Sequence, residues 1–161
     1  METETTSRPG VGDLVLERGP DELRVWHVAT PPTSRSGARV DVDVVLDGGE
    51  DLDAVDLALI TEVLADVDAA VDAALEFVHE SIQGHPDFFG VAGDDLAALR
   101  DASPAELPLH GPRLVFYAGD EWLVVFTEGE LPVCDPYGLG VAFDRRRPVR
   151  VEDLNEAEPV G

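Results

Sequence analysis

The hydrophobic positions of this 161-residue chain follow two different periods along the sequence. Up to residue 46, and again from residue 114, apolar residues stand in short runs or alternate with polar ones, which is the period of β-strands. Between Leu52 and Gly84 they recur every three or four residues, which is the period of an amphipathic helix. The pattern therefore predicts strands at both ends of the chain and a helix between them.

The N-terminal part predicts three strands. Leu14–Leu16 and Leu23–Val28 have the pattern of a hairpin, because Gly19 and Pro20 interrupt the apolar sequence between them. Residues 40–44 alternate valine with aspartate, which suits a strand that is buried on one side.

The C-terminal part predicts about four more strands. Leu114–Tyr117 and Trp122–Phe126 read as a second hairpin around the turn at residues 118–120. Further strands are expected around Leu139–Phe143 and Val149–Val151.

The central segment predicts one long helix that ends at Gly84, with Pro86 as a stop signal. A short helix is expected from Asp94 or Asp95 to Arg100. The apolar stripe of the long helix comprises Ile60, Val63, Leu64, Val67, Val71, Ala74, Leu75 and Val78, and its polar side carries Glu62, Asp66, Asp68, Asp72, Glu76 and Glu80.

This order of elements predicts an α+β fold, because the strands group before and after the helix instead of alternating with helices. We expect a largely antiparallel sheet of about six or seven strands, three before and about four after the helix, packed against one long amphipathic helix plus a short helix. A single domain should cover residues 13–154, with a flexible N-terminal tail at 1–12 and an acidic C-terminal tail at 155–161.

Charge is the most specific feature of the composition. The net charge is −23, yet 44% of the residues are hydrophobic, which favours a folded body with an anionic surface over a disordered chain. From Asp41 through Leu99 there are sixteen acidic residues and no arginine or lysine. We expect the outer side of the long helix to form a negative face that attracts basic partners and repels nucleic acid. A GC-rich genome or a high-salt cytosol is the alternative origin of this acidity.

A small basic patch is expected near the C-terminus, where Arg145, Arg146, Arg147 and Arg150 lie close together. The alternative is that the first three pair locally, with Asp144, Glu152 and Asp153.

The chain's only cysteine, Cys134, lies beside a predicted turn. Asp135-Pro136-Tyr137-Gly138 is typical of a β-turn, since proline fixes φ at about −65° and glycine tolerates a positive φ. Cys134 is either a small buried hydrophobic residue or a nucleophile. His79 and His85 lie near the expected helix end, where they either favour the helix dipole or join carboxylates in a metal site.

Targeting and cofactor signals are missing from the sequence. The N-terminus has no signal-peptide pattern and no apolar run is long enough to cross a bilayer, so we expect a cytoplasmic protein that does not bind membranes. A chain without lysine has no phosphate-binding G-x-x-x-x-G-K-[ST] loop, and we predict no cofactor and no metal.

The run "LVFYAGDEWLVVFTEGELPVCDPYGLGVAFD" at residues 114–144, together with size and element order, resembles small acidic single-domain bacterial proteins that include toxin-immunity and other uncharacterised domains. The resemblance implies a non-catalytic protein that binds a partner, and it brings no functional residues with it.

We therefore predict a non-catalytic protein-interaction module that binds a protein with a basic surface and does not bind nucleic acid directly. The partner-binding residues are predicted to be Asp66, Asp72, Glu76, Trp122 and Tyr137. Two alternatives stay open at this point: a small hydrolase or metal-assisted enzyme that uses Cys134 or His79 and His85 with nearby carboxylates, and an inhibitor that mimics DNA.

Overall fold

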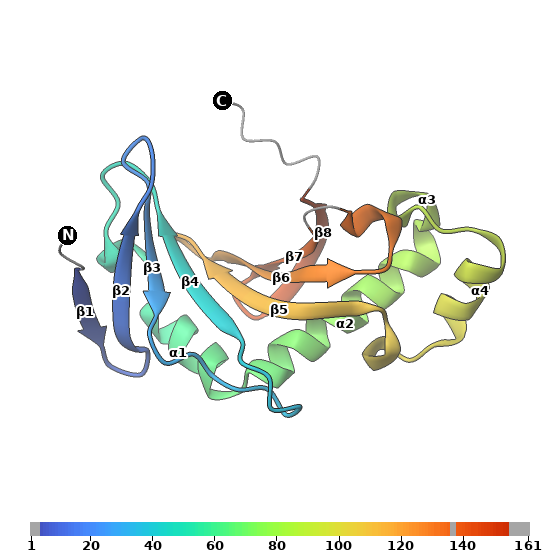
Figure 1. The fold of residues 1–161 in the computed structure, drawn as a ribbon, viewed down its shortest axis with the longest axis horizontal. Helices are drawn as coiled ribbons and strands as arrows, with labels where there is room; N and C mark the ends of the chain where they lie inside the picture. Colours follow the sequence, from blue (N-terminus) through green and yellow to red (C-terminus); the bar gives the residue numbers. More distant parts are fainter. Residues whose placement is uncertain (1–3, 136–137, 155–161) are drawn as a thin grey trace.

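The computed structural model describes residues 4–135 and 138–154, which form one eight-stranded sheet with helices on one of its faces (Figure 1). The strands neighbour one another in chain order, and all described strand pairs are antiparallel except β4–β5, which is parallel. The parallel pair arises because the helical segment lies between these two strands and carries the chain back to the same end of the sheet. The strands are β1 (Thr5–Arg8), β2 (Gly12–Arg18), β3 (Arg24–Val28), β4 (Asp41–Leu46), β5 (Leu109–Phe116), β6 (Glu121–Gly129), β7 (Leu139–Asp144) and β8 (Arg147–Asp153).

The helical segment between β4 and β5 consists of short pieces around one longer helix. Its α-helices are α1 (Leu57–Ala65), α2 (Val67–Gly84), α3 (Pro86–Phe89) and α4 (Gly93–Asp101), and the 3₁₀ turns of the chain are η1 (Leu52–Ala54), η2 (Pro104–Glu106) and η3 (Pro132–Cys134). The predicted α+β class and the largely antiparallel sheet are confirmed. The predicted helix end at Gly84 is confirmed as well.

The sheet has one strand more before the helices than the sequence pattern predicted, because residues 5–8 form β1 and pair antiparallel with β2. The prediction of a flexible tail over residues 1–12 is therefore wrong for these residues. β1 contains no buried residue, so its sequence, Thr-Thr-Ser-Arg, shows none of the apolar alternation that marks the other strands. The expected acidic tail at 155–161 lies outside the described residues.

The predicted long helix is divided in two at Asp66, which ends α1 and caps α2. Asp66 has an extended φ of −151°, and its side chain accepts a hydrogen bond from the backbone N–H of Ala69 at 3.2 Å. Aspartate is a favourable N-cap because its carboxylate satisfies a backbone donor of the first helical turn. The apolar period hid this break, since Val63 and Val67 on either side of it bury in the same core.

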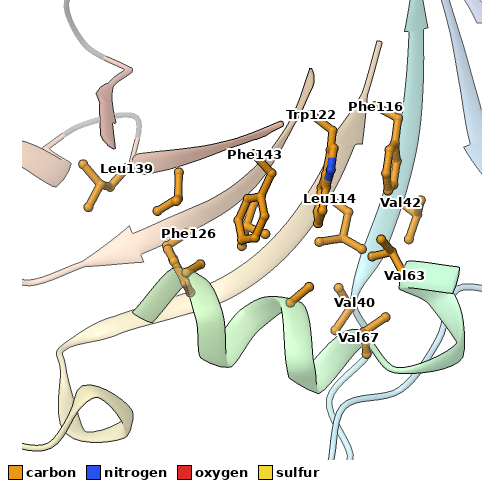
Figure 2. Packing of buried hydrophobic residues seen from close by; sticks show 14 of the residues in the cluster. Val40, Val42, Val63, Val67, Leu114, Phe116, Trp122, Phe126, Leu139 and Phe143 are labelled. Atoms are coloured by element: carbon orange, nitrogen blue, oxygen red, sulfur yellow. The ribbon is translucent and has the colours of Figure 1, made fainter. Parts of the chain in front are cut away.

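The core lies between the helices and the sheet face that carries a row of large side chains across neighbouring strands (Figure 2). Cross-strand register places Val44 opposite Phe116, Phe116 opposite Trp122, and Trp122 opposite Phe143. The Trp122 ring stacks on Phe116 at 5.0 Å and on Phe143 at 4.4 Å between centroids. Helix residues such as Val63 and Val67 cover this row.

Trp122 was predicted to bind a partner, and the structure corrects this prediction. Its side chain is 1% exposed, and its indole Nε1–H donates a hydrogen bond to the backbone oxygen of Arg145 at 2.5 Å. Alternation along β6 turns residue 122 toward the helices, together with Val124 and Phe126.

No helix of the described residues is long and apolar enough to span a membrane.

Replacing Trp122 with alanine should lower the free energy of unfolding by about 3–5 kcal/mol, because it removes the central ring of the stacked row and leaves a cavity. Urea denaturation followed by circular dichroism measures this change. The control is Tyr117→Ala, at a side chain that is 38% exposed, which should cost about 1 kcal/mol or less. Equal losses in the two variants would contradict the assignment of Trp122 to the core.

Candidate functional site

The acidic helix surface comprises the outward carboxylates of α1 and α2, which are Glu62, Asp66, Asp68, Asp72, Glu76 and Glu80. Asp68, Asp72, Glu76 and Glu80 recur every four residues, so they form a column along one side of α2. Like charges at this spacing repel each other and disfavour the helix slightly. The buried stripe on the other side of α2 keeps the helix in place and turns the column outward.

One internal arginine neutralises the first half of this column. Arg35, from the loop between β3 and β4, places a guanidinium nitrogen 2.7 Å from Asp72 Oδ2, and its backbone N–H lies 3.1 Å from both Asp68 carboxylate oxygens. Glu76 and Glu80 are exposed, and neither has an ion-pair partner among the residues that the structure describes. The second half of the column therefore presents uncompensated negative charge.

The predicted partner-binding residues thus occupy different environments. Asp66 is exposed and also caps α2, Asp72 is paired with Arg35, and Glu76 is exposed. Trp122 is buried, and Tyr137 lies outside the described residues.

Three arginines of the predicted basic patch form ion pairs with acidic residues. Arg146 lies 3.4 Å from Glu62 of α1, Arg145 lies 3.7 Å from Asp120, and Arg150 lies 2.9 Å from both Glu121 and Glu152. Pairing with acidic residues was the alternative in the sequence interpretation, although the partners of Arg145 and Arg146 come from other segments. The side-chain hydrogen bonds to Glu121 and then to Glu152 raise the pKa of Arg150.

A second site lies on the sheet face opposite the helices, and sequence reasoning did not find it. Glu17, His27, Asp43 and Arg113 come from β2, β3, β4 and β5 and form an ionic chain across these four neighbouring strands. A cavity of about 400 Å³ lies over the ionic chain. It is lined by these four residues and by apolar neighbours that include Val25, Val45 and Val115.

Asp43 is the centre of the ionic chain. It is 3% exposed, Arg113 donates to its Oδ2 atom, and His27 Nδ1 lies 2.5 Å from its Oδ1 atom. His27 Nε2 lies 2.6 Å from Glu17 Oε2. Carboxylates only accept hydrogen bonds, so both histidine contacts are hydrogen bonds only when the ring carries both N–H groups.

The side chains of the ionic chain contact one another. Both carboxylates already contact cationic or N–H groups, and no serine, threonine or cysteine lines its cavity. Within residues 4–135 and 138–154, no three His, Cys, Asp or Glu side chains are placed so that they could hold a metal ion. The arrangement is that of a charge network that ties strands together and faces a shallow cavity.

Cys134, His79 and His85 lie in different elements, since Cys134 is the last residue of η3 and the two histidines belong to α2 and its C-terminal end. Burial raises the pKa of the Cys134 thiol to about 11, so the thiol is protonated at neutral pH and is a poor nucleophile. His79 lies within α2, whereas His85 follows it as the C-cap residue. In the described part of the chain no hydrogen bond joins Cys134 to either histidine.

Removing Arg113 should destabilise the protein far more than removing Glu17. Arg113→Ala leaves the buried Asp43 carboxylate short of a partner and should lower the free energy of unfolding by about 3 kcal/mol. Glu17→Ala affects an exposed pair and should cost about 1 kcal/mol or less. The double variant Asp43→Val with Arg113→Leu removes both charges and should recover most of the loss in urea denaturation; no recovery would contradict the buried-charge explanation.

The raised pKa of Cys134 predicts a pH dependence of stability. Because the folded state disfavours the thiolate, the stabilisation is complete below the ordinary pKa of 9.0 and is lost as pH rises through about 11. Desolvation and then Glu152 also raise the pKa of Tyr117, so the contribution of Cys134 is the difference between the protein and its Cys134→Ala variant. Between pH 9 and 11 wild type should lose about 2 kcal/mol more than the variant. Equal losses across this range would contradict the prediction.

Comparisons with protein-family models, with curated protein sequences and with solved structures give no match. The resemblance of residues 114–144 to immunity-type proteins stays a prediction.

Proposed function

We propose that the protein is a non-catalytic interaction module whose acidic helix surface binds a protein with a basic surface, as an immunity protein, antitoxin or adaptor would. The observation that supports this proposal is the column along α2, whose Glu76 and Glu80 are exposed and have no ion-pair partner among the described residues.

Electrostatics explains what such a column contributes to binding. Aligned carboxylates create a negative potential that extends into solvent for about 8–10 Å at moderate salt. A basic partner is attracted and oriented before contact, which raises its association rate. Nucleic acid carries the same sign of charge and is repelled, which supports a protein partner.

Arg35 indicates which chemical groups this surface accepts. Its guanidinium lies within hydrogen-bond distance of Asp72, and its backbone N–H reaches Asp68, in the first half of the column. Glu76 and Glu80 continue the same four-residue spacing, and no arginine of the described residues pairs with them. An arginine or lysine of the partner would therefore find similar carboxylates one and two turns further along α2.

The alternatives from the sequence have weaker support. A cysteine hydrolase would need a thiolate at neutral pH, and the raised pKa of Cys134 opposes one. Mimicry of DNA uses the same carboxylates as the proposed site, so it is distinguished by competition with DNA.

Charge reversal at the second half of the column tests the proposal. In the variant Glu76→Arg with Glu80→Arg, association with the partner captured from native lysate by the tagged wild-type chain should be about tenfold slower and less sensitive to salt, measured by stopped flow. Asp66 and Asp72 are avoided because they cap α2 and hold Arg35.

The matched control is Glu128→Arg with Glu130→Arg, which changes two exposed carboxylates in and after β6 and alters the net charge equally. Its association rate should stay within about twofold of wild type. Equal slowing in both variants would reduce the effect to net charge and contradict a site on α2. If double-stranded DNA displaces the captured protein, DNA mimicry replaces the proposal.

A further inference from the structure

β8 is the last strand in the order of the described sheet, so one of its sides carries backbone groups without a neighbouring strand. It spans seven residues, whereas the strand at the other end, β1, spans four. An edge of this length can accept another strand unless its side chains prevent pairing.

Two features restrict where a strand can pair along β8. Pro148 lacks a backbone N–H, and the register of β8 against β7 shifts at Ala142/Phe143, so that Arg150 faces Ala142 while Pro148 faces Phe143. The regular ladder runs from Arg150 to Asp153. An added strand is therefore directed to the C-terminal half of β8.

The side chains of this half are arranged by face. Arg150 and Glu152 lie opposite Ala142 and Gly140, on the sheet face away from the helices. Val151 lies opposite Val141, on the helix-covered face. The sequence Arg150-Val151-Glu152 thus has a central apolar residue with opposite charges on either side.

An apolar groove of about 380 Å³ lies beside this edge, between β8 and the helices α2 and α3. Phe77, Phe88, Phe89 and Val151 form its apolar lining. Phe88 is 41% exposed, and Val149, on β8 itself, is 44% exposed. The edge therefore combines a side that no described strand covers, exposed apolar surface and side chains of both charges.

We propose that β8 pairs antiparallel with β8 of a second copy of this chain, around a two-fold axis at Val151. This goes beyond the proposed function, because it concerns a surface remote in sequence from the acidic column. In this register Arg150 of each copy faces Glu152 of the other, so the charges of the two strands complement each other twice. Val151 faces Val151 of the second copy beside the two grooves.

The internal contacts of Arg150 fit this arrangement. Its guanidinium already lies 2.9 Å from Glu121 and from Glu152, so it is held at the edge with compensated charge. Glu152 of the second copy adds a third carboxylate within reach on the same face. A two-fold axis also closes the assembly, because each copy uses its β8 edge once.

Substitutions of opposite sign at Val149 test the register, since residue 149 would face Asp153 of the second copy. Sedimentation velocity over a concentration series should show a monomer–dimer equilibrium for wild type. Val149→Asp places like charges opposite each other twice and should raise the dimer dissociation constant about tenfold, whereas Val149→Arg should leave it unchanged or lower it.

The control is the pair Thr30→Asp and Thr30→Arg, which makes the same changes in net charge at an exposed residue of the loop between β3 and β4 and should not alter the dimer. A monomer at every concentration would overturn the proposal. So would equal effects of the two signs at Val149, or the same response at Thr30, which would assign the effect to net charge.

Disulfide cross-linking gives a second, register-specific readout. In a Cys134→Ala background, Val151→Cys should form a covalent dimer under diamide, because directly opposite residues of antiparallel strands lie about 4.5–5.5 Å apart at Cα. Val149→Cys should not, since the register offsets the two copies of residue 149. Cross-linking through residue 149 in place of residue 151 would overturn the register.

Discussion

The architecture depends on the row of large apolar side chains in which Val44, Phe116, Trp122 and Phe143 meet across neighbouring strands beneath the helices. Side chains along a strand alternate between faces, so placing these residues under the helices sends their neighbours to the other face. Asp43 and Arg113 reach the opposite face in this way, and the apolar stripe of α2 likewise turns Glu76 and Glu80 outward. Both charged sites are therefore consequences of how the core is packed.

The fold class could be predicted because it depends on the periods of apolar residues, and those follow from burial on one face. The break at Asp66 could not, because Val63 and Val67 bury in one core on both sides of it, and only the capping preference of aspartate signalled it. Strand β1 has no apolar alternation, because none of its residues is buried. The prediction for Trp122 was wrong because an aromatic side chain fits either face of a strand. Only the pairing with Phe116 and Phe143 decides which face Trp122 occupies.

The position of the acidic column could be predicted, since the column is the polar side of a helix pattern. The pairing of Arg35 with its first two carboxylates could not be predicted. Arg35 lies far from Asp68 and Asp72 in sequence, and the loop that carries it has no periodicity that indicates where it docks. This contact moves the uncompensated charge from the middle of the column to Glu76 and Glu80. The ionic chain escaped sequence analysis for the same reason, because each of its members comes from a different strand and only cross-strand register unites them.

The position of the ionic chain explains what the buried Asp43 carboxylate contributes that an apolar side chain at this position would not. The parallel junction of β4 and β5 joins strands that are separated in sequence by the whole helical segment, so no turn sets their register. A shift of one residue in β4 would turn Asp43 into the core and separate it from Arg113. Because an unpaired buried charge costs several kcal/mol, that register is strongly disfavoured. The contact between Asp43 and Arg113 therefore fixes the register of the parallel pair β4–β5, whose strands no hairpin connects.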